Sequence, residues 1–267
     1  MIVHLHTICH NEIELIPFAI KYWREFIDHV YVYLMSSSND GSREYLQKFP
    51  DYITIIDIED NNNKSNQRNI DIKNNKWKIS KGIADFVIVT DFDEFVYSPI
   101  IKNELLYMKE NGLTIAKPIT YHLISKENIS NLNLNDDIFL HEQIKLAYDN
   151  AAHKELCKAD FGKYILFNPN EINDINYSVG AHKINPKGNV KYYDDSCIFL
   201  IHAKSLGLER LINNYKIQNS RLSKQDITRR WGIHYKLPEE KITKSFEFCL
   251  SNAVDIIENI NNKVNKK

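Results

Sequence analysis

Apolar strand-like runs alternate with helical patterns along the first 95 residues, and this alternation constrains the fold more than any other feature. The runs are short and rich in β-branched residues, and they cover residues 2–9, 30–34, 53–58 and 85–90. Strands that alternate with helices indicate a parallel sheet with right-handed crossovers and helices on both faces. We therefore predict an α/β fold with a mostly parallel, helix-covered sheet.

Helical patterns fill the three intervals between these runs. In the first interval, Pro17 suits an early helical turn, and an apolar stripe follows at helical spacing. That stripe consists of Ala19, Tyr22, Trp23 and Phe26. In the second, a polar turn over residues 36–42 precedes a short helix that ends before Pro50. In the third, we expect a helix with Ser65 as its N-cap and Gly82 as its end. One face of this third helix carries Ile70, Lys73, Trp77 and Ser80.

The fourth run ends abruptly in acidic residues. Asp91 and Asp93 lie two positions apart, so on extended backbone their side chains would point the same way. Hard divalent cations prefer oxygen ligands, and the pair could hold one such cation. A bare D-x-D motif is equally typical of a solvated junction between a strand and a loop, so its context must decide.

Three polar turns are expected to meet at one edge of the predicted sheet. Parallel strands present their carboxyl ends at the same edge, and ligands of open α/β sheets bind there. The turns are His10-Asn11-Glu12, residues 36–42 and Asp91-Phe92-Asp93. Their convergence favours a ligand site over a chance match to the D-x-D motif.

The alternation becomes less regular beyond Pro99. We expect a helix that ends at Gly112, a strand over residues 113–116, a polar loop over 125–137 and a helical segment over 136–150. Short strand-like pieces follow at residues 164–167, 181–184, 190–193 and 198–202. Two helices come last, over residues 206–222 and 238–261. The second is strongly amphipathic, which predicts packing on its own domain, with peripheral membrane contact as the alternative.

Charge and composition limit the classes of partner. Of the 267 residues, 43% are hydrophobic and 26% charged, as in globular proteins. A net charge of −1 gives no global field for nucleic acid, so any bound anion must be met by local charges. The apolar runs are shorter than the ~20 residues that span a bilayer, and we expect a cytoplasmic protein, with any membrane contact at the inner face. The four cysteines form no C-x-x-C pair, which favours packed, reduced thiols.

Taken in order, these motifs resemble those of the GT-A glycosyltransferases, and within them a bacterial family-2-like group. The resemblance covers about residues 1–220. Its first half rests on His10-Asn11-Glu12 after the first strand, on Ser38-Asn39-Asp40-Gly41-Ser42, which is similar to an S-x-D-G-S turn, and on Gln67-Arg68-Asn69. Its second half rests on the D-x-D-E-F metal motif Asp91-Phe92-Asp93-Glu94-Phe95 and on the late histidine segment Ile201-His202-Ala203-Lys204-Ser205.

The resemblance implies a GT-A (Rossmann-like) domain in three parts. Residues 1–120 would form the half that binds a nucleotide-sugar donor, and residues 121–205 an irregular acceptor-side half. Residues 206–267 would form a C-terminal helical segment. The implied reaction is an inverting, metal-dependent transfer of a sugar from a nucleotide-diphospho donor, with UDP as the first choice of nucleotide. The implied acceptor is a glycan or lipid-linked molecule in bacterial surface polysaccharide synthesis.

The same resemblance assigns metal and donor contacts. Mn²⁺ or Mg²⁺ would neutralise the charge that builds on the diphosphate leaving group. Asp93 is the first choice as metal ligand, with Asp91 reaching the ribose or a metal-bound water. His202 is a candidate third ligand, and a buried, hydrogen-bonded strand histidine is the alternative. Arg68 could contact phosphate through two hydrogen bonds, unless it is an exposed helical arginine, and Glu94 could contact the sugar.

Two assignments stay open at this point. The group's second strand usually ends in an acid that holds the nucleoside, whereas this chain has Leu34 or Met35 there, so Asp40 or Glu12 is the candidate substitute. Inversion also needs a base that takes the proton of the acceptor hydroxyl. The candidates are His182, Glu142 and the pair Asp194-Asp195. We prefer His182, because its ordinary pKa of about 6.5 suits the task, although it could simply be packed on a strand.

Two other classes of protein compete with this interpretation. A haloacid-dehalogenase-like phosphatase also places an aspartate nucleophile after an apolar strand, but its motif continues with Gly, and here Glu94 follows. A non-catalytic metal- or sugar-binding module is the second rival. Its zinc ligands would come from His4, His6, Cys9 and His10, but neighbouring residues of a strand point to opposite faces, which does not suit a single site.

Overall fold

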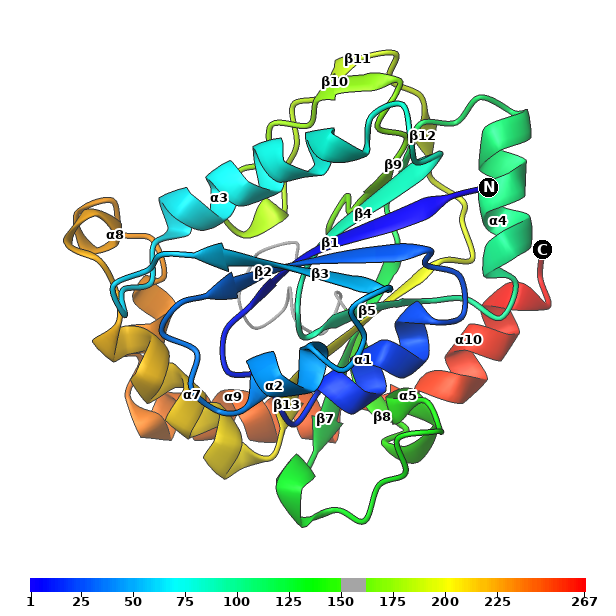
Figure 1. Ribbon diagram of the computed structural model, residues 1–267. Helices are drawn as coiled ribbons and strands as arrows, with labels where there is room; N and C mark the ends of the chain where they lie inside the picture. The colour runs from blue at the N-terminus through cyan, green and yellow to red at the C-terminus, as the bar shows by residue number, and fades with distance from the viewer. Residues whose placement is uncertain (150–161) are drawn as a thin grey trace.

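The computed structural model describes residues 1–149 and 162–267. Helices cover both faces of a mostly parallel sheet (Figure 1), so the predicted α/β fold class is confirmed. Three of the four cysteines, Cys9, Cys197 and Cys249, are buried as predicted, and Cys157 lies outside the described residues.

Within these two ranges the central sheet has seven strands, in the spatial order β12-β6-β9-β4-β1-β2-β3. Its parallel part consists of β4 (Phe86–Asp91), β1 (Val3–Cys9), β2 (His29–Met35) and β3 (Ile53–Ile58). In register, Thr7 of β1 lies between Val32 and Thr90. Beyond β4 the sheet continues through β9 (Leu166–Phe167), which is antiparallel to both neighbours, and then through β6 (Ile115–Ala116) and β12 (Tyr192–Tyr193).

The helices between the parallel strands begin where the sequence predicts. Helix α1 (Ile16–Trp23) has Pro17 in its first turn and lies with α2 (Ser42–Leu46) on one face of the sheet (Figure 1). Helix α3 (Asn66–Asn75) and the 3₁₀ turn η1 (Lys76–Ser80) cover the other face. The Ser65 side chain accepts a hydrogen bond from the backbone N–H of Arg68 at 3.2 Å, as an N-cap should.

A second sheet corrects the expectation that residues 121–205 are irregular. Its strands lie in the order β14-β8-β7-β13-β5 among the residues described. Their bounds are β5 (Glu94–Tyr97), β7 (Ile119–Ser125), β8 (Leu146–Asp149), β13 (Phe199–Leu206) and β14 (Val254–Asp255). The expected helix over 136–150 is also wrong for its described part, which holds only the short α5 (Leu140–Gln143) before β8. Pairing of β8 with β7 and β14 outweighs a weak helical pattern.

One further prediction is wrong in the segments around the two sheets. Helix α4 (Ile101–Glu110), η2 (Ile129–Asn131) and the hairpin of β10 (Ile172–Asp174) and β11 (Lys187–Gly188) complete this part of the chain. The strand expected at 181–184 is wrong, because η3 (Val179–Ala181) ends there. Its backbone turns through positive φ angles of 76° at Gly180 and 59° at Ala181, which no strand adopts.

The C-terminal part is helical, but the last predicted helix, over residues 238–261, is divided into two helices. The helices and turns are α7 (Leu208–Ser220), α8 (Lys224–Thr228), η4 (Ile233–Lys236), α9 (Glu239–Ser251) and α10 (Ile256–Val264). Helix α9 ends at Ser251 and β14 follows it. Helix α10 then begins after its N-cap Asp255, whose carboxylate accepts from the N–H of Ile257 at 2.8 Å. The apolar stripe of α9 packs in one cluster with residues of α7 and β7, as expected for packing on its own domain. No helix in the described part of the chain is long and apolar enough to cross a membrane.

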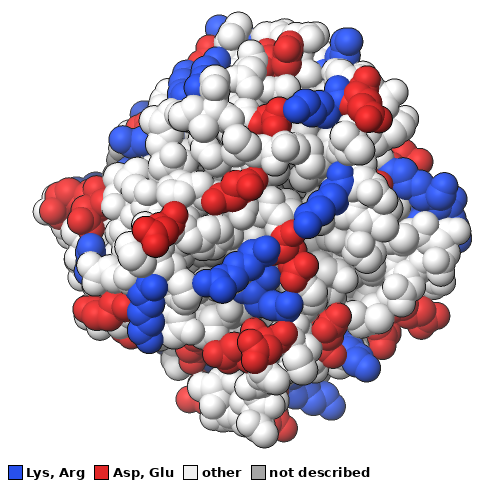
Figure 2. Space-filling model, turned by 45° about the vertical axis from the view of Figure 1, so that its right-hand side comes forward, with Lys and Arg blue, Asp and Glu red and all other residues white. Residues whose placement is uncertain are grey.

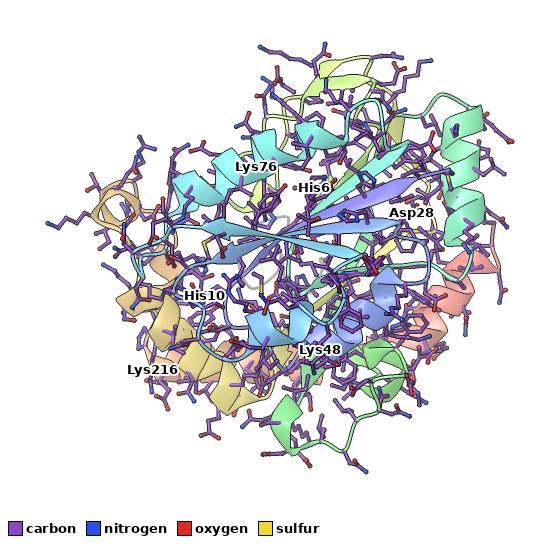
Figure 3. All side chains as sticks on the ribbon, viewed as in Figure 1. His6, His10, Asp28, Lys48, Lys76 and Lys216 are labelled. Atoms are coloured by element: carbon purple, nitrogen blue, oxygen red, sulfur yellow. The ribbon has the colours of Figure 1, made fainter. Side chains whose placement is uncertain are left out.

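The uncharged state of a buried histidine should make folding sensitive to acid. The β1 side chain of His6 lies beneath η1 (Figure 3), with its Nε2 atom 2.9 Å from the Ser80 hydroxyl and its Nδ1 atom 2.8 Å from the Tyr33 hydroxyl. Burial, reinforced by His4 and His29, lowers the pKa of His6 to about 3. The unfolded state therefore binds the proton first as the pH falls below 6.5, so stability is lost from that pH downward.

We expect His6 alone to reduce the free energy of unfolding by about 2 kcal/mol between pH 8 and pH 5. Urea unfolding of the wild type and of His6→Gln at both pH values measures this, because glutamine removes the titrating group. The variant should lose less stability on acidification than the wild type. Equal losses in the two proteins would contradict the assignment.

Candidate active site

A cavity of about 490 Å³ opens at the carboxyl ends of β1 and β4. Figure 3 labels His10, which directly follows β1 on this edge of the sheet. The cavity brings together most of the predicted site residues: His10, Glu12, Arg68, Asp91, Asp93, Glu94, His182 and His202. Asn11 and Asp40 do not line it. Side chains from all three predicted segments of the chain contribute to its wall.

Asp91 is held by two buried lysines. Alternation along β4 puts Asp91 on the same face as Val87 and Val89, which pack under η1, so α3 can reach it. One carboxylate oxygen lies 2.7 Å from Nζ of Lys73 on α3, and the other lies 3.0 Å from Nζ of Lys163. Burial alone would raise the pKa of Asp91, but the two ammonium groups outweigh it and hold the pKa well below its usual range. Asp91 is therefore a fixed anion whose two oxygens are already engaged.

Lys163 also forms an ion pair with Glu94. The Glu94 carboxylate accepts in addition from the backbone N–H of Asp91 at 3.1 Å. Asp91, Glu94, Lys73 and Lys163 thus form a quartet of two negative and two positive groups, in which Glu94 and the two lysines are buried and Asp91 is partly exposed. Sequence reasoning did not identify Lys163, and it placed Lys73 on one face of the third helix, with Trp77 and Ser80, without giving it a role.

Asp93 faces a different partner, because extended backbone stops at Asp91. The chain turns at residues 92–93 and enters β5, where Glu94 pairs with His202 of β13. Asp93 Oδ2 lies 3.2 Å from His202 Nε2. Burial opposes ionisation, but His202 overcomes it and lowers the pKa of Asp93 to about 2. The expected extended backbone from Asp91 to Asp93 is therefore wrong, and the two carboxylates have different partners.

Asp93 and His202 are hydrogen-bonded to each other, and their spacing is also compatible with two ligands of one cation. Two ligand atoms at right angles around an octahedral cation, with bonds of about 2.1 Å, lie about 3 Å apart. The separation of 3.2 Å between Asp93 Oδ2 and His202 Nε2 matches that geometry. His202 Nδ1 lies 3.0 Å from His122 Nδ1, which orients the ring. Across residues 1–149 and 162–267, no group of three or more His, Cys, Asp or Glu side chains is arranged to hold a metal. A cation would therefore need further ligands from a bound phosphate.

The rival zinc site is not assembled either. His4 and His6 both lie within hydrogen-bonding distance of the Ser80 hydroxyl, beneath η1. His10 instead points to Arg221, whose Nη1 donates to its Nδ1 at 2.9 Å. These contacts account for the histidines without a metal.

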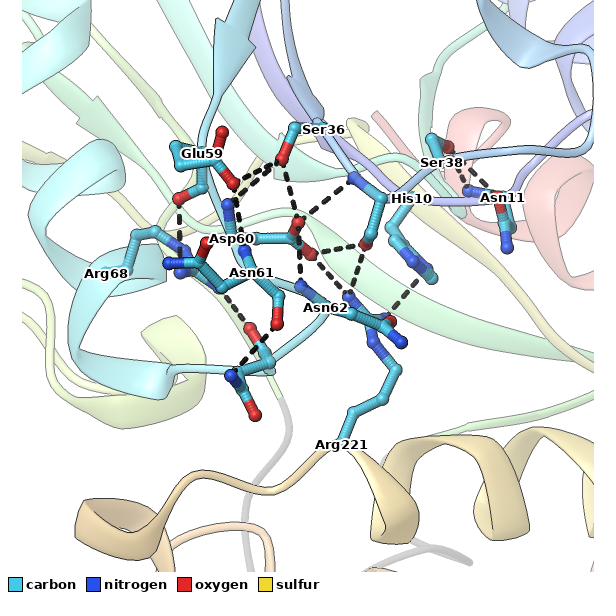
Figure 4. Close-up of polar contacts among 12 residues, drawn as sticks. His10, Asn11, Ser36, Ser38, Glu59, Asp60, Asn61, Asn62, Arg68 and Arg221 are labelled. Atoms are coloured by element: carbon cyan, nitrogen blue, oxygen red, sulfur yellow. Dashed lines mark hydrogen bonds and ion pairs between the residues drawn. The ribbon is translucent and has the colours of Figure 1, made fainter.

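Asp40 and Asn11 fix the polar turns around the cavity. The two carboxylate oxygens of Asp40 accept from the backbone N–H of Ile13 at 2.9 Å and of Ser42 at 3.0 Å. Asn11 bonds to the Ser38 hydroxyl (Figure 4) and to the neighbouring turn. Asp40 therefore holds loops in place, whereas Glu12, the other candidate for nucleoside recognition, keeps its carboxylate in the cavity wall. Burial and the charge of Asp93 raise the pKa of Glu12 well above its usual range.

A buried ion pair closes the edge of the cavity next to β3, and sequence reasoning did not identify it. Asp60 follows β3 and accepts from Arg221 Nη2 at 2.7 Å, from the Ser37 hydroxyl at 2.6 Å and from the Ser36 hydroxyl at 3.1 Å (Figure 4). Arg221 caps the end of α7, so this pair joins segments 161 positions apart. Burial and the nearby Arg221 lower the pKa of His10 to about 4, which keeps its ring neutral.

His182 is the one candidate base in the cavity wall as described. Its ring lies against Gly180, where an added Cβ would come within 2.7 Å of His182 Cδ2, so this close approach and the φ of 76° both require glycine. Glu142 and Asp195 lie outside the cavity lining, and Asp195 is paired with Lys263 at 2.7 Å.

The cavity is more positive than the chain as a whole. Its basic side chains are Lys64, Arg68, Lys73, Lys163, Lys204, Arg221 and Arg230. Its acidic side chains are Glu12, Asp91, Asp93 and Glu94. Seven positive charges against four negative leave +3, in a chain whose net charge is −1. On the face shown in Figure 2, by contrast, acidic and basic side chains are interspersed and neither sign forms a continuous patch. The cavity lining therefore carries a local excess of positive charge that can attract an anion.

The fold and the cavity define an α/β protein with an anion-attracting site at the carboxyl ends of its parallel strands. No family model and no curated protein matches the chain. Among solved structures, residues 1–349 of S. aureus TarS align over 81% of this chain and 63% of that chain, with 12% identity and a TM-score of 0.41. TarS 1–349 in complex with UDP-GlcNAc aligns over 83% and 66%, with 11% identity and a TM-score of 0.39. CMP:2-keto-3-deoxy-manno-octonic acid synthetase complexed with CTP aligns over 47% and 54%, with 14% identity and a TM-score of 0.28. The chain thus spans less than two thirds of the length of TarS 1–349, and likeness at this level assigns it no activity.

Proposed function

We propose that the protein is a glycosyltransferase that moves a sugar from a nucleotide-diphospho donor to a glycan or lipid-linked acceptor. The observation that carries the proposal is the 490 Å³ cavity in which the Asp93–His202 pair meets an excess of positive charge. Its volume lies within the range of about 300–1,000 Å³ typical of small-molecule sites. A UDP sugar is the first candidate donor, and synthesis of a bacterial surface polysaccharide is the proposed context.

Asp93 and His202 would hold Mn²⁺ or Mg²⁺ together with the phosphates of the donor. When bound, the cation supplies Lewis-acid neutralisation of the charge that builds on the departing diphosphate. Lys73 and Lys163 hold the carboxylates of Asp91 and Glu94 in fixed positions, from which they can accept hydrogen bonds from ribose or sugar hydroxyls. Such groups are already oriented before the donor arrives, which reduces the entropy lost on binding.

The remaining proposed roles concern the acceptor and the nucleoside. His182 would take the proton from the acceptor hydroxyl as the new glycosidic bond forms with inversion. Glu12 and His10, next to β1, would contact the nucleoside or ribose. Arg68 already donates to the backbone carbonyls of Glu59 and Asn63, so we assign it the orientation of that loop as well as a phosphate contact.

Thermal unfolding with a panel of nucleotides tests this function. A nucleoside diphosphate that binds the folded protein at a hundred times its Kd should raise the melting temperature by about 5 °C or more. We expect UDP or another nucleoside diphosphate to do so with Mn²⁺ present, and nucleotide sugars to be turned over in the presence of a glycan acceptor. The proposal fails if no nucleotide stabilises the protein. Phosphate release from small phosphate esters that disappears in Asp91→Asn would instead establish the rival phosphatase.

A further inference from the structure

Two lysines in the cavity differ from the others in having no carboxylate partner. Lys73 and Lys163 are paired with Asp91 and Glu94. In the part of the chain that the structure describes, no acidic side chain lies within 4.0 Å of Lys64 or Lys204. An ammonium group in a cavity wall is costly to desolvate when no anion compensates it. Among the four lysines of the cavity lining, these two are therefore the ones most available to a ligand.

The aromatic ring of Tyr235 lies near the ammonium groups of both Lys64 and Lys204. The Nζ atom of Lys64 lies 4.2 Å from the ring centroid of Tyr235 and 3.0 Å from its hydroxyl oxygen. The Nζ atom of Lys204 lies 5.7 Å from the same centroid and 5.8 Å from that of Tyr215. Ring faces attract ammonium groups but supply only about 0.5–2 kcal/mol, so this contact orients the lysines without neutralising them.

Lys204 also lies next to the proposed metal ligands. It is two residues after His202 on β13, and burial alternates along this stretch, with Ile201 and Ala203 buried and His202 and Lys204 partly exposed. His202 and Lys204 thus face the cavity from the same side of the strand. An anion bound by Lys204 would be adjacent to the Asp93–His202 pair.

Tyr235 reaches this position because the segment after α7 is tied to the loop before α3. Lys64 N–H donates to the carbonyl of Arg221 at 2.7 Å, and Ser223 N–H donates to the carbonyl of Lys64 at 3.1 Å. The buried carboxylate of Asp226 accepts from the N–H of Asn66 at 3.2 Å. The backbone of Lys64 is thus itself an anchoring point for the segment that brings Tyr235 to its side chain.

We propose that Lys64 and Lys204, oriented by Tyr235, form a diphosphate subsite next to the Asp93–His202 pair. This inference rests on the proposed function for its natural ligand, but the subsite recognises the two phosphate groups and does not require a nucleoside. It places the leaving group between residues of the β3–α3 loop and of β13. Tyr235 is a positioning residue in this arrangement.

Calorimetric titration with inorganic pyrophosphate and with UDP, in the presence of EDTA, tests the subsite. Lys64→Met and Lys204→Met should each weaken binding of both probes by about ten-fold or more, since each removes a charge-assisted contact. Lys48→Met is the matched control, because Nζ of Lys48 also lies over a tyrosine ring, 4.3 Å from the centroid of Tyr45, but on the outer surface by α2 (Figure 3). The control should bind like the wild type, and all variants should keep the wild-type melting temperature.

Variants of Tyr235 test whether its ring, which orients Lys64 and Lys204, contributes to binding apart from the charges of the two lysines. Tyr235→Leu removes the ring and should weaken pyrophosphate binding, whereas Tyr235→Phe keeps the ring and should weaken it less. The proposal is overturned if the wild type does not bind pyrophosphate, or if the lysine variants bind both probes as tightly as Lys48→Met does. Pyrophosphate binding that needs both lysines, without any sugar transfer, would support the subsite and refute the glycosyltransferase. Sugar transfer with unchanged donor affinity in both lysine variants would support the glycosyltransferase and refute the subsite.

Discussion

Replacing Asp93 by alanine should reduce sugar transfer by at least about a hundred-fold, because a catalytic cation contributes several kcal/mol and each 1.36 kcal/mol is a factor of ten. The variant removes one of the two proposed metal ligands and leaves His202 without its Asp93 partner at Nε2. Stabilisation of the protein by UDP with Mn²⁺ should fall to the level seen with EDTA. Initial rates with a nucleotide sugar, together with melting temperatures, measure both effects.

Asp174→Ala is the matched control for this experiment. Asp174 lies on β10 outside the cavity, and its carboxylate is paired with Lys78 at 2.6 Å, so the variant also breaks one ion pair. It should transfer sugar at the wild-type rate. Full activity in Asp93→Ala would refute the metal assignment, and equal loss in both variants would point to a general effect of losing a carboxylate.

The largest expected loss of stability comes from Asp60→Ala. The side chains of Asp60 and Arg221 are 0% and 9% exposed, so the variant leaves a buried guanidinium without its counter-ion. Removing one partner of such a pair costs about 3–5 kcal/mol. Urea unfolding should show this loss as a lower transition midpoint. Because the pair anchors the segment that carries Tyr235, pyrophosphate affinity should fall as well.

A surface ion pair from the same region provides the comparison. Asp57 on β3 pairs with Arg43, and their side chains are 63% and 36% exposed. Asp57→Ala should cost less than about 1 kcal/mol, as exposed pairs do. The double variant Asp60→Leu/Arg221→Met should recover much of the stability lost in Asp60→Ala, since it leaves no buried charge unpaired. A double variant as unstable as the single one would show that the neighbouring serines, not the ion pair, dominate.

The parallel part of the fold was predictable because its signals are local. Continuous apolar runs, Pro17 in the first turn of α1 and Ser65 at the start of α3 each act within a few residues. The second sheet was not predictable in this way. Strands β5 and β13 pair although about a hundred positions separate them, and β8 forms only because β7 and β14 flank it. Pairing partners of that kind leave little trace in the spacing of apolar residues.

The candidate site, like the fold, was predictable from the sequence only in part. Asp93 and His202 were identified as potential metal ligands from the order of motifs, and the structure brings them together. The sequence offered one further signal for Lys73, because it shares a helix face with Trp77, and a lysine that is buried there requires a partner of opposite charge. Nothing in the sequence linked Arg221 to Asp60 or Tyr235 to Lys64, because each pair spans more than 150 positions and lies in polar segments without periodicity.

The backbone bridge between Lys64 and Leu222 has a consequence for how the protein is made. Strands β1 to β4 come from the first third of the chain, whereas Tyr235 comes from its last part. The wall that carries Tyr235 can dock only after residue 235 has left the ribosome. The diphosphate subsite proposed above would therefore be completed late in synthesis, and a shorter nascent chain would lack it.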